Sequence, residues 1–241
     1  MKKTVLLFVT MFLLTGVSIA QSRAYSVKGG LTIGTQQWEG IDRDPLFSYH
    51  GAASIESVPE DNSFALFAQL GYHVKGSAWR NTFFSGPTGN ISVSTQKFEY
   101  KNVSLLLGFK RNFLERTNSN VYYLMGVRGD YTVGTNLDEY VAFNEFNNAP
   151  VYPFDEAVRK WNYGVTVGAG VEFPFAEYVS GILEISISPD FSDQYRQGAF
   201  SASVIQNGSS VLRSFPERKI RNLVLEISVG FRFLHKIEYI D

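Results

Sequence analysis

The sequence contains no cysteine, only three histidines and no run of basic residues. Without cysteine there is no disulfide scaffold, no thiolate metal site and no thiol nucleophile. The 22 Lys and Arg residues nearly balance the 23 Asp and Glu residues, which gives a formal net charge of -1. Because binding to phosphates needs clustered positive charge, this balance predicts that nucleic acid is not a partner.

Long apolar runs are also missing, except near the first residue. After residue 20 there is no stretch of about 18 consecutive apolar residues, which excludes a protein built from transmembrane helices. The exception follows Lys2 and Lys3, spans residues 5–14 and leads to the small residues Ser18 and Ala20. A membrane anchor would need roughly 20 apolar residues. We therefore predict a cleaved secretory signal peptide over residues 1–20 and a single domain over residues 21–241.

The mature chain alternates between apolar and polar residues. In residues 223–233, Leu, Ile, Val and Phe hold every second position, and mostly small or polar residues hold the others. A period of two is typical of a β-strand. Helical periodicity is absent from the mature chain, so we predict an all-β fold.

Eight segments show this alternation, and most of them reach ten residues or more. Strands of soluble proteins have about five or six residues, whereas tilted strands that cross an outer membrane need about 9 to 11. The lengths therefore favour a membrane barrel. The predicted strands are residues 25–36, 47–57, 64–75, 98–109, 122–133, 161–173, 179–188 and 220–233.

The connections between these strands alternate between short and long. Antiparallel strands that thread a membrane place all odd connections on one side and all even ones on the other. We therefore predict an eight-stranded antiparallel transmembrane β-barrel in the outer membrane, with short periplasmic turns and long extracellular loops. The short connections are residues 59–62, 112–120 and 174–177, and the long ones are residues 38–45, 77–96, 134–160 and 189–219.

A soluble barrel with an apolar calyx is the alternative. It would turn Leu, Val and Phe inward and cover its outside with charge, whereas the polar phase here is mainly Gly, Ser, Thr and Asn. Such residues suit the cramped interior of eight strands. Four apolar residues in the polar phase are then expected to pack inside: Phe67, Leu106, Leu124 and Val224. Aromatic residues near strand ends predict girdles at the membrane interfaces: Phe47, Tyr49, Tyr72, Tyr131, Tyr163 and Phe233.

Several charged residues share the inward phase. Charges buried in a barrel have to be paired or hydrated, so we hypothesise a salt-bridge network that plugs the lumen and prevents conduction. Contact with trapped water is the alternative for each pair. The predicted network consists of Lys28, Glu56, Arg128, Asp130, Glu172, Glu184, Glu226 and Arg232.

The sequence offers little catalytic chemistry. It lacks a phosphate-binding glycine loop, a Gly-x-Ser-x-Gly elbow and a two-histidine zinc motif. His50 and His73 are predicted to meet on neighbouring strands, and hydrogen bonds to lumen residues explain them better than a metal, since no third ligand is evident. We therefore predict no catalytic, cofactor-binding or metal-binding residue, no cofactor and no enzymatic activity.

Recognition, if present, is expected in the long loops. Residues 134–160 combine acidic residues with aromatic ones, a mixture that either binds a partner or packs as a cap. In the last long loop, Asn207-Gly208 predicts a hairpin that extends above the membrane. The candidate recognition surface consists of Tyr140, Phe143, Phe146, Tyr152 and Phe154.

Three segments resemble strands of a known family. Residues 100–109 (YKNVSLLLGF), 161–173 (WNYGVTVGAGVEF) and 223–233 (LVLEISVGFRF) are similar to strands of the outer-membrane β-barrel family of the Bacteroidota type, often labelled PorT-like. The resemblance implies a small barrel with periplasmic termini and no common catalytic activity. It favours a structural or interaction role through the extracellular loops, with outer-membrane lipid and protein partners, as a component of a surface or secretion assembly. A narrow solute channel or transporter and a membrane-embedded hydrolase are the alternatives.

Overall fold

The computed structural model describes residues 22–38, 42–58, 64–80, 82–86, 89–93, 95–116, 119–146, 152–206 and 209–236. The predicted signal peptide lies outside this part of the chain. Within the described residues, no helix is both long and apolar enough to cross a membrane.

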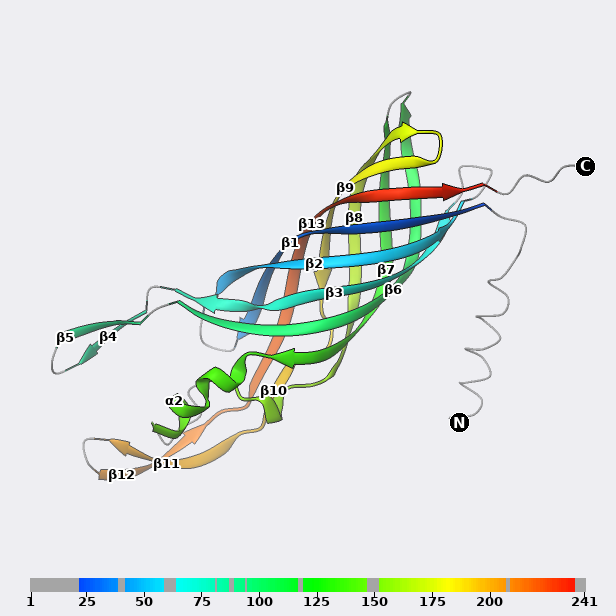
Figure 1. The fold of residues 1–241 in the computed structure, drawn as a ribbon. Helices are drawn as coiled ribbons and strands as arrows, with labels where there is room; N and C mark the ends of the chain where they lie inside the picture. Colours follow the sequence, from blue (N-terminus) through cyan, green and yellow to red (C-terminus); the bar gives the residue numbers. More distant parts are fainter. Residues whose placement is uncertain are drawn as a thin grey trace, which may run out of the picture.

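Eight long antiparallel strands form a closed ring, as the alternation predicts (Figure 1). In Figure 1 the first strand, in blue, lies beside the last, in red, and this pairing runs from Arg23 opposite His235 to Trp38 opposite Ile220. Closure leaves no unpaired edge in the wall. The strands, in order around the ring, are β1 (Arg23–Trp38), β2 (Asp44–Ser57), β3 (Ala65–Trp79), β6 (Gln96–Arg116), β7 (Ser119–Thr135), β8 (Trp161–Ala176), β9 (Val179–Pro189) and β13 (Arg218–His235).

The strands extend further than the sequence pattern predicts. The expected connection over residues 112–120 is wrong, because β6 continues to Arg116 and pairs there with Ser119, the first residue of β7. The residues after Phe109 are polar and resemble a loop in sequence. They nevertheless continue the backbone ladder, with a register irregularity between Asn112 and Leu114.

Both ends of the ring-forming chain lie at one end of the barrel, and the additional elements lie at the other (Figure 1). We call these the turn end and the loop end. A short helix, α2, corrects the expectation of no helix, because six residues are too few to show helical periodicity. The hairpin predicted around Asn207-Gly208 is present. The loop-end elements are β4 (Thr82–Gly86), β5 (Gly89–Val93), η1 (Leu137–Tyr140), α2 (Val141–Phe146), η2 (Asp155–Ala157), β10 (Tyr195–Gln197), β11 (Phe200–Gln206) and β12 (Ser209–Phe215).

The wall of the barrel is apolar outside and polar inside. On the outward phase, Leu70 is 61% and Val127 64% exposed, whereas the inward Asn102 and Asp130 are fully buried. This arrangement is the reverse of a soluble calyx, and it matches a wall that contacts lipid.

The four apolar residues of the inward phase pack inside, as expected. Phe67, Leu106 and Leu124 are buried together with Tyr122 and Ile182. A separate member of the same phase, Val224, is fully buried. Apolar side chains thus fill part of the lumen.

The expected aromatic girdles lie on the outer face near the strand ends. Phe47, Tyr49 and Tyr163 are all more than half exposed. Neighbouring rings pair along the rim, with Tyr49 6.2 Å from Tyr72. Amphipathic rings in this position suit the boundary between lipid and water.

The outward phase can be tested with one substitution at two depths. We expect Val127→Arg, midway along β7, to lower the free energy of unfolding by about 2 to 4 kcal/mol, because a charge there meets the bilayer midplane. The matched control Val133→Arg lies on the same face of β7 near the loop end and is expected to cost about 0 to 1 kcal/mol. Urea unfolding in lipid vesicles measures both. Equal costs at the two depths would contradict a wall that faces lipid.

Candidate functional site

The candidate site is the lumen, where the inward phases of eight strands meet. All eight residues of the predicted charge network face it and take part in ion pairs there. Four further residues complete the network: His73, Lys75, Lys110 and Asp190.

The central cluster lies towards the loop end. The Lys75 ammonium of β3 lies 2.7 Å from an Asp130 carboxylate oxygen and 2.9 Å from one of Asp190. Arg128 donates from Nε to Asp130 at 2.9 Å and also donates to Asp190. Two cations and two carboxylates therefore form a cross-linked set that joins three parts of the wall.

His73 connects this cluster to β13. Its Nε2 atom lies 3.2 Å from Asp130 Oδ1, and its Nδ1 atom lies 3.0 Å from Glu226 Oε1. Carboxylates only accept hydrogen bonds, so both contacts are hydrogen bonds when the ring carries both protons. In that form the ring is a cation between two anions.

A second cluster closes the turn end. Lys110 lies 3.0 Å from a Glu56 oxygen and also pairs with Glu172. Arg232 pairs with Glu56 at 2.6 Å and lies 3.6 Å from Glu172. These two cations and two anions again balance each other.

A third pair lies between the two clusters. Lys28 donates to Glu184, which also accepts a hydrogen bond of 2.7 Å from the Tyr122 hydroxyl. The ammonium of Lys110 lies 4.4 Å from the centre of the Tyr122 ring and thereby links this pair to the turn end. Over the described lumen, five lysine and arginine residues and His73 meet six carboxylates.

The four additional members were missed for two reasons. Lys110 and Asp190 lie just beyond the ends of the predicted strands. Lys75 is the last residue of its predicted strand, and the predicted approach to His50 gives His73 no charged partner. Continuing the alternation past those ends would have found them, since Lys110 follows Gly108 and Asp190 follows Ser188 in the inward phase.

The part of the lumen that the structure describes contains little free space. Two internal cavities of about 20 Å³ each lie beside these clusters, one next to Lys28, Glu56 and Lys110 and the other next to His50 and His73. A cavity of this size holds about one water molecule. The pairs therefore occupy most of the described interior, and each of the two cavities has room for about one water molecule.

The two histidines lie directly opposite each other, as predicted. His50 is hydrogen bonded at both nitrogens, to the Thr32 hydroxyl at 3.0 Å and to the Ser228 hydroxyl at 2.8 Å. Among the described residues, no group of three or more His, Asp or Glu side chains could hold a metal ion. Each nitrogen of the two rings has a hydrogen-bond partner in the lumen.

The aromatic residues of the predicted recognition surface divide between interior and exterior. Tyr140 and Tyr152 are buried in an aromatic cluster with Trp38 and Phe98, and Phe143 is 41% exposed. The Phe154 ring lies 6.0 Å from that of Tyr195, and the side chain of Phe146 is outside the described part. Most of these rings therefore pack as a cap over the barrel.

Side-chain hydrogen bonds hold this cap together and tie it to β6. Asn144 brackets Tyr152, donating to its carbonyl at 3.0 Å and accepting from its amide at 2.9 Å. Asn136 accepts a hydrogen bond from the Glu99 amide at 2.8 Å, and Tyr140 donates to the Lys97 carbonyl at 2.7 Å. The cap is therefore tied to the first residues of β6.

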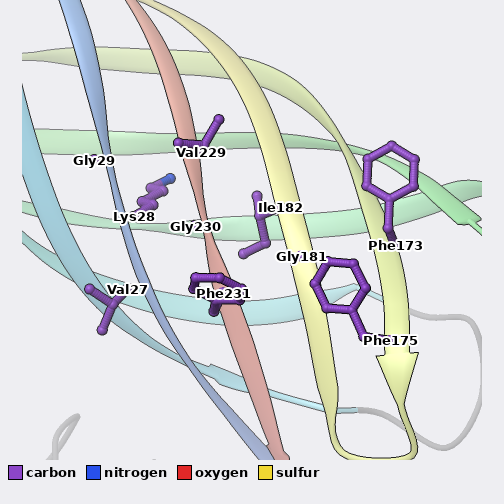
Figure 2. Close-up of a pocket in the computed structure, with 10 residues that line it drawn as sticks. All are labelled: Val27, Lys28, Gly29, Phe173, Phe175, Gly181, Ile182, Val229, Gly230 and Phe231. Atoms are coloured by element: carbon purple, nitrogen blue, oxygen red, sulfur yellow. The ribbon is translucent and has the colours of Figure 1, made fainter.

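An apolar groove of about 550 Å³ lies on the wall near the turn end (Figure 2). Figure 2 shows Phe173 and Phe175 on β8 standing beside β9, with Phe231 across it on β13. The groove exists because Gly181, on β9, has no side chain. A Cβ atom at this position would lie 2.7 Å from the Phe175 ring. This part of the wall presents an apolar recess to the lipid.

Residues 19–192 match a family model described as "Outer membrane protein beta-barrel domain". No curated protein matches the chain. The chain is similar to the crystal structure of Neisserial surface protein A (8% identity, 88% of this chain and 96% of that chain, TM-score 0.49). It is also similar to OprG from Pseudomonas aeruginosa (9% identity, 90% of this chain and 98% of that chain, TM-score 0.47). A third similar structure is a major outer membrane protein from Thermus thermophilus (13% identity, 88% of this chain and 99% of that chain, TM-score 0.45).

Removing one lumen cation tests the network. We expect Lys75→Met to lower the free energy of unfolding by about 3 to 5 kcal/mol, because it leaves two buried carboxylates short of a partner. The control Arg221→Met removes an exposed partner of Asp193 and is expected to cost about 0 to 1 kcal/mol. Unfolding in urea, followed by heat-modifiable gel mobility, measures both. A mild effect of Lys75→Met would mean that water already solvates the site.

Proposed function

Since the chain belongs to the outer membrane β-barrel family whose model covers residues 19–192, we propose that it is a sealed, non-enzymatic barrel that acts through its loop end. The turn end then faces the periplasm and the loop end faces the cell exterior, after export directed by residues 1–20. We further assign the chain to the PorT-like, Bacteroidota-type branch, on the three strands that resemble it.

The filled lumen is the observation that carries this proposal. Five lysine and arginine side chains and His73 pair with six carboxylates across the ring, and the described cavities beside them reach only about 20 Å³ each. A solute path through the barrel would have to break these pairs. The lumen therefore supports a rigid wall better than it supports transport.

The described residues also do not favour a hydrolase. His50 accepts from or donates to Ser228, but its other nitrogen meets Thr32 rather than a carboxylate. His73 meets two carboxylates and no hydroxyl. Ser228 is 2% exposed, so a substrate has no approach to it. Around these two histidines, the described residues do not assemble a nucleophile, a base and an orienting acid in one place.

The loop end has the features of a display surface. It carries an aromatic cap and the β11–β12 hairpin, in which Val211 is 45% and Leu212 75% exposed. We propose that these loops contact a protein partner in a surface or secretion assembly, while the apolar wall, with its groove near Gly181, contacts outer-membrane lipid. Nucleic acid is not among the proposed partners.

Electrical recordings test the sealed lumen. Purified protein inserted into planar bilayers is expected to show no stable, large single-channel current, because paired side chains occupy the path. A water-filled porin recorded in the same bilayers is the control. Steady large currents from the wild-type protein would overturn the proposal of a sealed barrel.

Two matched deletions test the role of the loops. Deleting residues 199–216 leaves Gly198 and Glu217 as a two-residue turn between Gln197 and Arg218, which already pair directly. Deleting residues 81–94 leaves residues 80 and 95 as a two-residue turn between Trp79 and Gln96, which also pair directly. Both variants should keep heat-modifiable mobility, because the ring is untouched.

We expect at least one of these deletions to abolish photo-crosslinking of a partner at the cell surface. Comparison of the two variants shows which hairpin carries recognition. Crosslinks that persist unchanged in both variants would place recognition elsewhere and contradict the proposed role of the hairpins.

A further inference from the structure

A buried guanidinium lies among aromatic rings at the loop end. Arg43 precedes β2, and its guanidinium carbon lies 3.6 Å from the centre of the Trp38 ring and 4.8 Å from those of Trp79 and Phe98. Tyr140 packs on Phe98 with ring centres 5.0 Å apart. The rings attract the positive charge through their faces, but ring faces do not accept its N–H groups as a carboxylate does.

The hydrogen-bonding capacity of this cluster is unmet. Arg43 Nε and Nη1 and the Tyr100 hydroxyl are buried and have no hydrogen-bond partner, and no other buried side-chain nitrogen or oxygen in the described residues shares this condition. Tyr100 as a whole is fully buried. Buried polar atoms without a partner are rare in proteins. All three of these atoms carry hydrogens, so what the cluster lacks is an acceptor.

The positive charge of Arg43 also lacks a direct counterion among the described residues. Arg43 forms no ion pair with any described residue, and a second guanidinium, that of Arg218, lies 5.6 Å from the centre of the same Trp38 ring. Burial, and then the positive charge of Arg218, lower the pKa of Arg43 to about 10. In the lumen of the same protein every charge of the network faces an opposite charge. Here a buried cation faces aromatic rings and another cation.

We propose that Arg43, Tyr100 and the surrounding rings form a binding site for an oxyanion, namely a phosphate, sulfate or carboxylate group. Such a group supplies both missing components, several acceptor lone pairs and a negative charge. Arg43 as a residue is only half-buried, so part of its side chain is open to solvent at the loop end. The site is separate from the lumen network, and it does not depend on the protein partner proposed for the loops.

Tryptophan fluorescence gives a direct readout of this site. The sequence has three tryptophans, and Trp161 is 74% exposed on the wall. In a Trp161→Phe background the remaining emission comes from Trp38 and Trp79, which both contact the Arg43 guanidinium. The folded protein in detergent is titrated with inorganic phosphate, with glucuronate or with lipid A, and sodium chloride at equal ionic strength is the control.

We expect a saturable change in emission with at least one of these probes and none with sodium chloride. Response to the free anions indicates a soluble ligand, whereas response to lipid A alone indicates a lipid headgroup. Arg43→Gln should abolish saturation. Tyr100→Phe should weaken binding about tenfold, the size expected for one hydrogen bond to a charged group. Arg80→Gln, which removes an exposed guanidinium 5.4 Å from the Phe47 ring at the same end, should leave binding unchanged.

Heat-modifiable mobility separates loss of binding from loss of folding. If Arg43→Gln does not fold, Tyr100→Phe removes a donor without changing charge and tests the site alone. The proposal is overturned by a wild-type response that sodium chloride reproduces. Equal binding by the wild type and by a folded Arg43→Gln or Tyr100→Phe variant would also overturn it.

Discussion

The narrowness of an eight-stranded ring governs the structure of this protein. A ring of this size encloses just enough space for side chains, and alternation turns every second residue of every strand into that space. Any charge placed there is removed from bulk water and needs an opposite charge within reach. The pairing of five lysine and arginine residues and His73 with six carboxylates in the described lumen follows from this constraint, and so does the small size of the described cavities.

The cap obeys a different rule from the lumen. Below the rim, polarity is turned inward and apolar residues face lipid, so the barrel is inside out relative to a soluble protein. Above the rim, Trp38, Phe98 and Tyr152 are buried in an aromatic cluster like that of a soluble core. The same chain therefore changes its pattern of burial where the surrounding solvent changes from lipid to water.

The sequence predicts the ring well because alternation with period two leaves a direct trace in it. Residues 223–233 show the outward and inward phases of β13 without further information, and all eight predicted lumen charges face inward. Strand ends were less predictable, since polar residues such as Arg111 and Asn112 resemble loops whether or not they pair. That is why Lys110 and Asp190 were missed. The burial of Tyr140 and Tyr152 depends on contacts between distant loops, which periodicity does not record.

The seam between β1 and β13 joins the two extremities of the folded chain. It is the ladder with the largest separation in sequence, so it requires the whole polypeptide to be present before it can close. Until then the growing sheet has two edges with unsatisfied amide and carbonyl groups, which would pair with any available strand. Both edges therefore need to be shielded during assembly of the barrel. A polypeptide that ended before β13 would remain an open sheet with two unpaired edges.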